Sequence, residues 1–430
     1  MEKIDDLFDK IVKIANSRGF VFNASSIYGG LRSSYDYGPL GALLKSNISK
    51  SWWKDINQDN RVSIFPIDTA IIQSSKVWKA SGHLDEFTDP MVDHKPTGER
   101  FRADQVPDNL KKEDLTEPRE FNLMFETNIG PVNNENSAVY LRPETAQGIF
   151  VNFENVQRTM RAKLPFGIAN IGKSFRNEIT PGQFIFRTRE FEQMEIEYFC
   201  KKEDENEWFE FWVEKRLEWY KGIGIPEEKL RLREHKDNEL AHYASKTVDI
   251  EFEYPWGWGE LEGIANRGIF DLSSHESSSG KDLSYFEPDT NEKITPVVIE
   301  PAGGLTRTLF ALMCSTYDEE AVNDTIRTLF RFNFEIAPVQ IGILPLSKKE
   351  ELIKVSSDIQ QILQKFFRTE VDITQSIGKR YRRQDEIGTP YCVTIDFESL
   401  EDLSVTIRNR DSMDQERIKI DNLLDYFSKI

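Results

Sequence analysis

The chain has 430 residues, of which 39% are hydrophobic and 30% charged, and its formal net charge is -18 at pH 7. This length suits two or three domains with a large core, and the composition excludes an intrinsically disordered chain. The negative charge excludes a protein that coats nucleic acid nonspecifically, so a nucleic-acid partner would need local basic clusters such as residues 378–383.

The cysteines stand alone in the sequence. Cys200, Cys314 and Cys392 cannot form a disulfide framework or a CxxC metal clip, which favours a reducing, cytoplasmic setting. The five histidines lack the spacing of zinc ligands. No apolar run is long enough to span a bilayer, so we expect no membrane partner.

The first half of the chain predicts helices followed by strands. Residues 1–20 predict an amphipathic helix, and residues 39–56 predict a second helix that begins at a proline. A strand-like run follows at residues 61–72, and the polar residues 103–118 predict a loop or small insertion. Strands are predicted at residues 138–144, 167–178 and 184–199, and their alternation favours an antiparallel sheet with one packed face and one face lining a polar cleft.

One stretch matches a phosphate-binding motif. Gly167–Ser174, GIANIGKS, fits the P-loop pattern to the letter. A P-loop is a glycine-rich turn that opens a helix, whereas residues 168–171 favour a strand and residues 175–183 predict a strand end followed by a Pro-Gly turn. The stretch therefore predicts the first strand of a hairpin and not a P-loop.

The second half of the chain predicts a helix-rich segment and then a separate domain. Residues 203–221 predict an aromatic-rich helix that packs in a core, and residues 302–320 predict a glycine turn that enters a buried helix. From Val339 strands and helices alternate, which predicts a small α/β domain with a parallel or mixed sheet and a boundary close to Pro338.

The predicted hairpin at residues 170–199 gathers charged residues. Arg176 and Glu178 share a face of the first strand, and Arg187, Arg189 and Phe191 share a face of the second. Guanidinium groups hold phosphate oxygens bidentately, and a carboxylate can hold an amino group. The same residues could instead form only a cross-strand ion pair on a solvated face. The pattern alone leaves both interpretations open.

Several motifs of the sequence resemble those of a known protein family. FRNE followed by RTREF resembles motif 2 of the class II aminoacyl-tRNA synthetases, and GGLTR, which ends at Arg307, resembles motif 3. The phrases IYGGLRSSYDYGPLG, FRADQ, LRPETAQGIFVNF, GWGELEG and KRYRRQDEIGTPYCVT occur in the order found in glycyl-tRNA synthetases of the homodimeric type. The resemblance covers nearly the whole chain.

The resemblance implies an α+β fold. A class II antiparallel β-sheet catalytic domain flanked by helices would span residues 1–337, with small insertions near 103–118 and 201–258, and a C-terminal α/β anticodon-binding domain would span residues 338–430. The implied enzyme activates glycine with ATP to glycyl-adenylate and pyrophosphate, and then transfers glycine to the 3′-terminal ribose of tRNA(Gly). It also implies Mg²⁺, no zinc, and a homodimer with residues 43–56 near the interface.

The family's residue roles can be carried onto matching positions. Arg176 would hold the ATP α-phosphate, Glu178 would meet the adenine amino group, and Phe191 and Arg307 would stack on the two faces of adenine. Glu260 would be a Mg²⁺ ligand, so the implied catalytic residues are Arg176, Arg307 and Glu260. The implied ATP contacts are Arg176, Asn177, Glu178, Phe186, Arg187, Thr188, Arg189, Glu190, Phe191, Glu260, Leu261, Gly304, Leu305, Thr306 and Arg307. The implied glycine contacts are Arg102, Glu144, Phe191, Glu192, Gln193, Met194, Glu195, Glu300, Pro301, Ala302, Gly303 and Gly304.

Two positions depart from the family pattern. Ala302 stands where a serine is usual, and Thr306 stands where an acid is usual. Two rival hypotheses remain: a catalytically silent relative that only binds nucleic acid, and a P-loop nucleotide hydrolase. The intact Arg176, Glu178 and Arg307 argue against the first, and the strand-forming residues 168–171 argue against the second.

Overall fold

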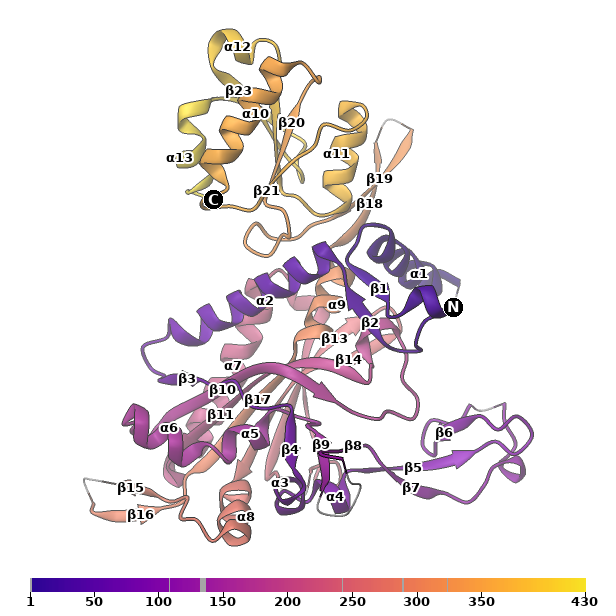
Figure 1. Cartoon of the computed structure of the whole chain (residues 1–430), viewed down its shortest axis with the longest axis vertical. Coiled ribbons are helices and arrows are strands. Elements are labelled where there is room, and N and C mark those ends of the chain that lie inside the picture. The colour runs from indigo at the N-terminus through magenta and orange to yellow at the C-terminus, as the bar shows by residue number, and fades with distance from the viewer. Residues whose placement is uncertain (1, 108, 132–136, 242, 288–289, 323) are drawn as a thin grey trace.

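The computed structural model describes residues 2–107, 109–131, 137–241, 243–287, 290–322 and 324–430. Its centre is a seven-stranded sheet of order β12-β13-β14-β17-β11-β10-β3, antiparallel except where β3 pairs with β10 (Figure 1). The strands are β3 (Ile64–Pro66), β10 (Phe166–Phe175), β11 (Glu190–Cys200), β12 (Leu230–Glu234), β13 (Lys246–Tyr254), β14 (Gly257–Gly268) and β17 (Val297–Gly304). The predicted antiparallel sheet is confirmed.

The two faces of this sheet have different surroundings. One face packs into a core with α1 (Glu2–Ser17), α2 (Pro39–Asn57), α7 (Glu205–Gly222) and α9 (Leu305–Thr316), which includes the buried side chains of Met194, Ile264 and Phe310. Over part of the other face, α5 (Ala146–Phe150), α6 (Phe153–Met160) and α8 (Phe270–Ser279) cover a second core around Phe166 and Phe199. The remaining part of that face carries polar side chains, as the alternation predicts.

The hairpin of β10 and β11 is confirmed, but its strands end earlier at the turn than predicted. β10 ends at Phe175, which pairs with Glu190 at the start of β11. The assignment of residues 176–178 and 184–189 to strands is wrong, because Gln183 and Phe184 have φ values of 58° and 56° and lead into a 3₁₀ turn. Gly167–Ser174 lies wholly within β10, with no helix after it, so the P-loop is excluded.

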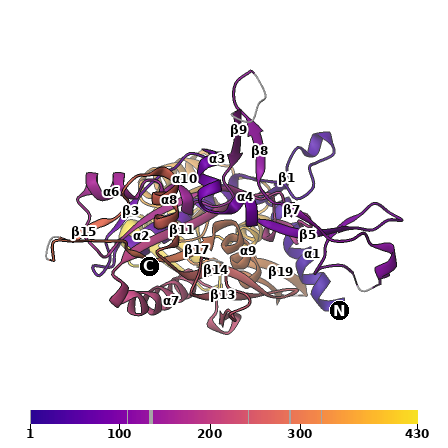
Figure 2. The ribbon, with the colours of Figure 1, turned by 90° about the horizontal axis from the view of Figure 1, so that it is seen from below.

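Smaller sheets flank the central one. They pair β1 (Val21–Asn23) with β2 (Tyr35–Tyr37), β9 (Ala138–Leu141) with β4 (Ile72–Ser74) and β8 (Phe125–Asn128), β5 (Thr88–Asp93) with β6 (Arg100–Arg102) and β7 (Arg119–Asn122), and β15 (Tyr285–Glu287) with β16 (Glu292–Ile294). The short helices α3 (Ser75–Ala80) and α4 (His83–Glu86) lie between them in the chain. Seen from below, β8 and β9 project from the body (Figure 2). The predicted insertion at 103–118, of which residue 108 lies outside the described residues, links β6 to β7.

The end of the chain forms a separate five-stranded mixed sheet of order β21-β20-β22-β23-β24, as predicted. Its strands are β20 (Ile341–Pro345), β21 (Thr369–Val371), β22 (Tyr391–Ile395), β23 (Ser404–Asn409) and β24 (Gln415–Lys419), and its helices are α10 (Glu350–Leu363), α11 (Ile377–Glu386), α12 (Ser399–Asp402) and α13 (Leu423–Phe427). The hairpin of β18 (Tyr317–Val322) and β19 (Thr325–Phe330) connects it to α9 (Figure 1). Buried Arg327 on β19 anchors it through Asp385 at 2.8 Å.

The basic cluster at residues 378–383 lies on α11. Arg380 is buried and donates to the carbonyl oxygens of Pro345 and Asp372, at 2.5 and 3.1 Å. Arg383 forms an ion pair with Asp372 at 2.6 Å. Two of the cluster's charges therefore stabilise the fold, while Lys379 and Arg382 are exposed. Among the described helices, none combines the length and the apolar character needed to cross a membrane.

Candidate active site

The polar face of the central sheet contains two adjoining cavities, with volumes of about 90 and 230 Å³. Arg176, Gln193, Glu260 and Ala302 lie on the walls of both, so one ligand could extend from one cavity into the other. The first cavity is also lined by Glu178, Phe186, Arg187, Thr188, Phe191, Gly303, Gly304, Thr306 and Arg307. The second is also lined by Glu144, Glu195, His235, Glu239, Ala241, Tyr243, Thr247, Asp249, Gly263, Ala265 and Glu300.

Two guanidinium groups and two aromatic rings dominate the first cavity. Arg307, at the start of α9, pairs with Glu260 at 3.2 Å, and its guanidinium lies 4.6 Å from the ring centre of Phe186. Arg176, just past the end of β10, donates to the carbonyl oxygen of Pro143 at 3.1 Å and lies 5.3 Å from the ring centre of Phe191. Cations beside aromatic rings suit a ligand with a polyphosphate and a planar base.

Three buried carboxylates gather at the second cavity. Glu144 accepts a hydrogen bond from Gln147 at 3.0 Å and lies 3.3 Å from the imidazole of His83. Glu195 accepts from the backbone N–H of Thr145 at 2.9 Å. Glu300 forms an ion pair with Arg267 of β14, which also holds Asp271. The acids are thus fixed in place, and their charge is only partly compensated.

This crowding changes the proton affinity of the acids. Burial and repulsion from Glu144 raise the pKa of Glu195 to about 7. Burial also raises the pKa of Glu300 to about 8, although Arg267 opposes the shift. Burial disfavours the charge on Glu144 too, but the neighbouring His83 and Arg267 hold its pKa below the usual value. A bound cation would favour the ionised forms, so the cavity is suited to a small positively charged group.

Most predicted contacts line these cavities. The residues of the predicted ATP set that line the first cavity are Arg176, Glu178, Phe186, Arg187, Thr188, Phe191, Glu260, Gly304, Thr306 and Arg307. Those of the predicted glycine set are Glu144, Gln193, Glu195, Glu300 and Ala302 in the second cavity, with Phe191, Gly303 and Gly304 in the first. One detail differs: the ring beneath Arg307 is that of Phe186, whereas Phe191 lies beside Arg176.

Several predicted side chains lie on the opposite face of the sheet. Glu192 forms an ion pair with Lys45 of α2, and Met194 is buried in the core, because alternate residues of β11 point to opposite faces. Leu261 and Leu305 are likewise buried in that core. These side chains therefore lie away from the two cavities, and the contacts of these residues with ATP or glycine stay predictions.

Other predicted residues lie outside both linings. Glu190 forms an ion pair with Lys173, and Arg189 donates to the carbonyl oxygen of Glu178 at 3.3 Å. Arg102 lies on β6, 2.7 Å from Asp104 and 3.3 Å from Asp89. Asn177 and Pro301 are also absent from the two linings. A glycine contact by Arg102 stays a prediction.

The sequence interpretation missed a group on the far wall of the second cavity. The Nε2 atom of His235, next to β12, lies 2.7 Å from a carboxylate oxygen of Asp249 of β13, and Tyr243 lies in the connection between these strands. Arg267, which holds Glu300, was missed as well. The available signal was the alternation of Thr247 and Asp249 with apolar neighbours in β13, which marks a polar strand face.

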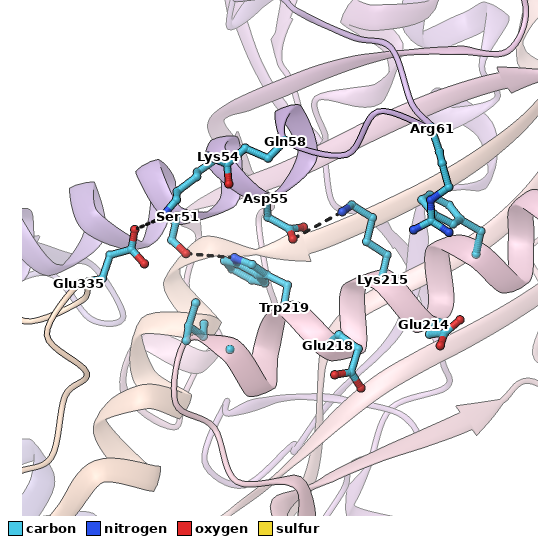
Figure 3. Close-up of a pocket in the computed structure, with 13 residues that line it drawn as sticks. Ser51, Lys54, Asp55, Gln58, Arg61, Glu214, Lys215, Glu218, Trp219 and Glu335 are labelled. Atoms are coloured by element: carbon cyan, nitrogen blue, oxygen red, sulfur yellow. Dashed lines mark hydrogen bonds and ion pairs between the residues drawn. The ribbon is translucent and has the colours of Figure 1, made fainter. Parts of the chain in front are cut away.

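A larger cavity, of about 480 Å³, lies elsewhere, between α2 and α7 (Figure 3). Its charged groups neutralise one another: Lys215 lies 3.5 Å from Asp55, and Lys54 lies 2.8 Å from Glu335. Trp219 donates to Ser51 at 3.3 Å across the groove. Because these acids and bases pair with one another, whereas the acids of the second cavity are only partly compensated, the two cavities on the polar face of the sheet form the better candidate for an active site.

The chain is similar to known proteins over nearly its whole length. Residues 125–317 match the family described as tRNA synthetase class II core domain (G, H, P, S and T), and residues 340–430 match the family described as anticodon binding domain. The chain is 51% identical to a glycine–tRNA ligase of Acetivibrio thermocellus, over 99% of this chain and 98% of the relative. Glycine–tRNA ligases of Ruminiclostridium cellulolyticum, with 51% identity over 97% of each chain, and of Bacillus cereus, with 48% identity over 98% of each chain, are similarly close.

Proposed function

The chain belongs to the class II glycine–tRNA ligases, and from that premise we propose that its polar cleft binds ATP in the first cavity and glycine in the second. The enzyme joins glycine to tRNA(Gly) with ATP as the energy source. One observation carries the assignment of the cleft: Arg176 and Arg307 face a cavity that opens into another bordered by Glu144, Glu195 and Glu300.

The first step joins glycine to the nucleotide. A carboxylate oxygen of glycine attacks the α-phosphorus of ATP, the bond from that phosphorus to the bridging oxygen breaks, and pyrophosphate leaves. Arg176 lies where the two cavities meet, so its guanidinium can stabilise the negative charge that grows on the α-phosphate. Arg307, Phe186 and Phe191 would hold the base, and positioning would supply most of the remaining rate.

The second step transfers glycine to tRNA. A hydroxyl of the 3′-terminal ribose attacks the carbonyl carbon of glycyl-adenylate, its proton is lost, and AMP leaves. No covalent intermediate with the enzyme is needed. We assign residues 1–337 to catalysis and residues 338–430 to anticodon binding. The match of residues 340–430 to an anticodon-binding family supports this division.

Mg²⁺ would neutralise the phosphates of ATP when bound. Glu260 fits this ion, because its carboxylate lies on the cavity wall with about half of the side chain exposed, 47%, and Mg²⁺ usually takes one or two protein carboxylates beside phosphate oxygens. We expect no zinc, since Cys200, Cys314 and Cys392 are free and buried. Metal analysis of the purified protein tests this expectation.

Selection of glycine would depend on space and charge. Glycine has no side chain to bind, and one extra methylene in an apolar pocket changes binding by only about 1–3 kcal/mol. Buried acids that hold the ammonium close to Gln193 and Ala302 would bring the α-carbon against these walls, where the side chain of a larger amino acid would overlap them. Ala302 replaces a hydroxyl contact with a methyl group at this wall.

The test of the function is ATP–pyrophosphate exchange with each amino acid in turn. Glycine alone should support exchange. Exchange supported by alanine or serine at similar kcat/KM would contradict the proposed pocket, and no exchange with any amino acid would favour the hypothesis of a silent nucleic-acid-binding relative.

Lys173→Ala separates this proposal from a nucleotide hydrolase. Lys173 is exposed and pairs with Glu190 outside the cavities, so we expect glycine-dependent exchange to fall by less than about tenfold, because exposed ion pairs contribute about 0–1 kcal/mol. A P-loop lysine contacts phosphate directly, so complete loss of activity in this variant would support the rival hypothesis.

Glycine binding should release protons. The free cavity holds Glu195 and Glu300 with pKa values raised to about 7 and about 8, chiefly by burial. The glycine ammonium favours the ionised carboxylates and lowers both values, so protons leave on binding. Release should be largest between pH 7 and 8 and vanish at higher pH, where both groups are already ionised. Calorimetry in two buffers of different ionisation enthalpy measures this release, and proton uptake would contradict the assignment of the pocket.

We further propose a homodimer in a cytoplasmic, reducing compartment. The free cysteines agree with the compartment, and the family resemblance supports the dimer. Residues 43–56 of α2, which border the groove of Figure 3, would lie near the interface. Light scattering on the purified protein gives the mass, and a stable monomer would refute the dimer.

A further inference from the structure

One buried carboxylate of the central sheet is not used by the proposed mechanism. Glu197 follows Glu195 on the same face of β11, and β17 pairs Ala302 with Glu195 and Ile299 with Tyr198, so Glu300 is the cross-strand neighbour of Glu197. One carboxylate oxygen from each of Glu195, Glu197 and Glu300 lies within 4.8 Å of the corresponding oxygens of the other two. Glu197 itself is fully buried.

The environment of Glu197 does not suit a negative charge. Neither of its oxygens accepts a hydrogen bond from the described residues, whereas Glu195 accepts from Thr145 and Glu300 from Arg267. An ionised carboxylate buried without a partner is strongly disfavoured. Repulsion adds to this cost, because several carboxylates this close cannot all ionise.

Among the described residues, the cation that acts on Glu197 is Arg267, which forms its ion pairs with other acids. The groups that face it are Glu195 on β11, Glu300 on β17, Arg267 on β14 and Asp271 on α8. Arg267 donates to both oxygens of Asp271, at 2.7 and 2.8 Å, and also to Glu300. Its donors are thus committed to other acids. Burial and the charge of Glu300 together raise the pKa of Glu197 well above its usual value.

We propose that Glu197 is a neutral carboxylic acid that shares its hydroxyl hydrogen with Glu300 and so positions Glu300 in the glycine pocket. The idea rests on the proposed function, because Glu300 is the residue that would meet the glycine ammonium. A carboxylate can accept several hydrogen bonds, so Glu300 can accept from Glu197, Arg267 and the ammonium together. The shared hydrogen also removes one negative charge from a pocket that must be balanced by a single ammonium.

Two substitutions test the neutral state. Glu197→Gln keeps the shape and a hydrogen-bond donor, so the glycine KM in ATP–pyrophosphate exchange should stay within about threefold of the parent value. Glu197→Met has a similar shape but no donor, and should raise the glycine KM by about tenfold or more, since the bond is to a charged group, while the ATP KM stays unchanged. Equal damage by both variants would overturn the proposal, because it would mean that the charge of Glu197 is needed.

Infrared spectroscopy detects the protonated carboxyl group of Glu197 directly. The infrared spectrum of the parent enzyme minus that of Glu197→Gln should contain the C=O stretch of a protonated carboxyl group, which is distinct from carboxylate bands. Absence of that band would overturn the proposal. Because the spectrum needs no substrate, it decides the state of Glu197 even if the parent enzyme shows no glycine-dependent exchange, which would refute the proposed function instead.

Glu262→Gln is a matched control for general loss of stability. Glu262 is another buried acid of the sheet, on the face toward α7, where it pairs with Arg216 at 2.8 Å. Glu262→Gln should lower thermal stability without changing the glycine KM. A KM change as large as that of Glu197→Met would mean that the effect of Glu197→Met on KM is due to general destabilisation, and it would overturn the proposal.

The rival hypothesis is a divalent cation held by Glu195, Glu197 and Glu300. If added Mg²⁺, Mn²⁺ or Zn²⁺ stabilised the chelator-treated parent but not Glu197→Gln, the cation would replace the shared hydrogen.

Discussion

Replacing Arg176 by alanine should lower kcat/KM for glycine-dependent ATP–pyrophosphate exchange by about 10²- to 10³-fold, the loss usual for removing one preorganised donor to a developing negative charge. The guanidinium lies on the walls of both cavities and is held by the carbonyl oxygen of Pro143 and the ring of Phe191. It is therefore already oriented at the point where the carboxylate of glycine would meet the α-phosphate.

The fold should survive this change. Arg176 lies beyond the end of β10 and has no ion-pair partner within the described residues, so its loss breaks no ion pair that holds the fold together. Thermal unfolding should be close to that of the parent. Arg231→Ala is a matched control, because Arg231 is a surface arginine of β12 that pairs with Glu251 and lies 4.3 Å from the ring centre of Trp258. Near-normal exchange in Arg176→Ala would refute the role assigned to this residue.

The parts of the site that could be predicted come from continuous stretches of sequence. Arg176, Glu178, Arg187 and Phe191 lie within one hairpin, and their spacing alone already brings them together. Period-two alternation also predicted correctly that this sheet has one apolar and one polar face. The family resemblance added Glu144, Glu260 and Glu300, which no local pattern connects to the hairpin.

The sequence is less informative where tertiary packing decides. The family resemblance implied glycine contacts by Glu192 and Met194 together with Glu195, but the alternation of β11 turns their side chains to the opposite face, where Glu192 pairs with Lys45 of α2 and Met194 is buried in the core. His235, Asp249 and Arg267 were missed because they lie next to β12, on β13 and on β14, and the order of these strands on one side of β17 is a long-range property of the sheet. No sequence spacing reports that neighbourhood.

Arg267→Met should be the most destabilising of the proposed substitutions. Arg267 is only 2% exposed, donates to Asp271 at 2.7 and 2.8 Å, and pairs with Glu300. Removing one partner of a buried ion pair costs about 3–5 kcal/mol of unfolding free energy, because the other charges remain buried without compensation. Urea unfolding measures this loss. Since Glu300 also loses the group that orients it, the glycine KM should rise in any folded fraction.

The loss of stability in Arg267→Met should depend on pH through the carboxyl group of Glu300. Without Arg267, its positive charge no longer offsets the effect of burial on the pKa of Glu300. This pKa, already about 8 in the parent, should therefore rise further. An acid with a raised folded-state pKa binds protons more strongly in the folded state, so its contribution to stability falls as pH rises from the unfolded-state value toward the folded-state value. Because Glu300 ionises near pH 8 in the folded parent and at higher pH in the variant, the two proteins should diverge above that pH. The variant should therefore be less destabilised relative to the parent at about pH 7 than at about pH 9, and the opposite order would contradict the assignment.

Arg216→Met is a control that separates a loss of stability from a change in the glycine pocket. Arg216 is fully buried on α7 and pairs with Glu262 at 2.8 Å and Asp55 at 3.2 Å, on the opposite face of the same sheet. Its loss should cost a similar free energy of unfolding and leave the glycine KM unchanged. If both variants changed the glycine KM equally, or if Arg267→Met lost less than about 1 kcal/mol with a normal KM, Arg267 would not be the residue that holds the acids of the glycine pocket in place.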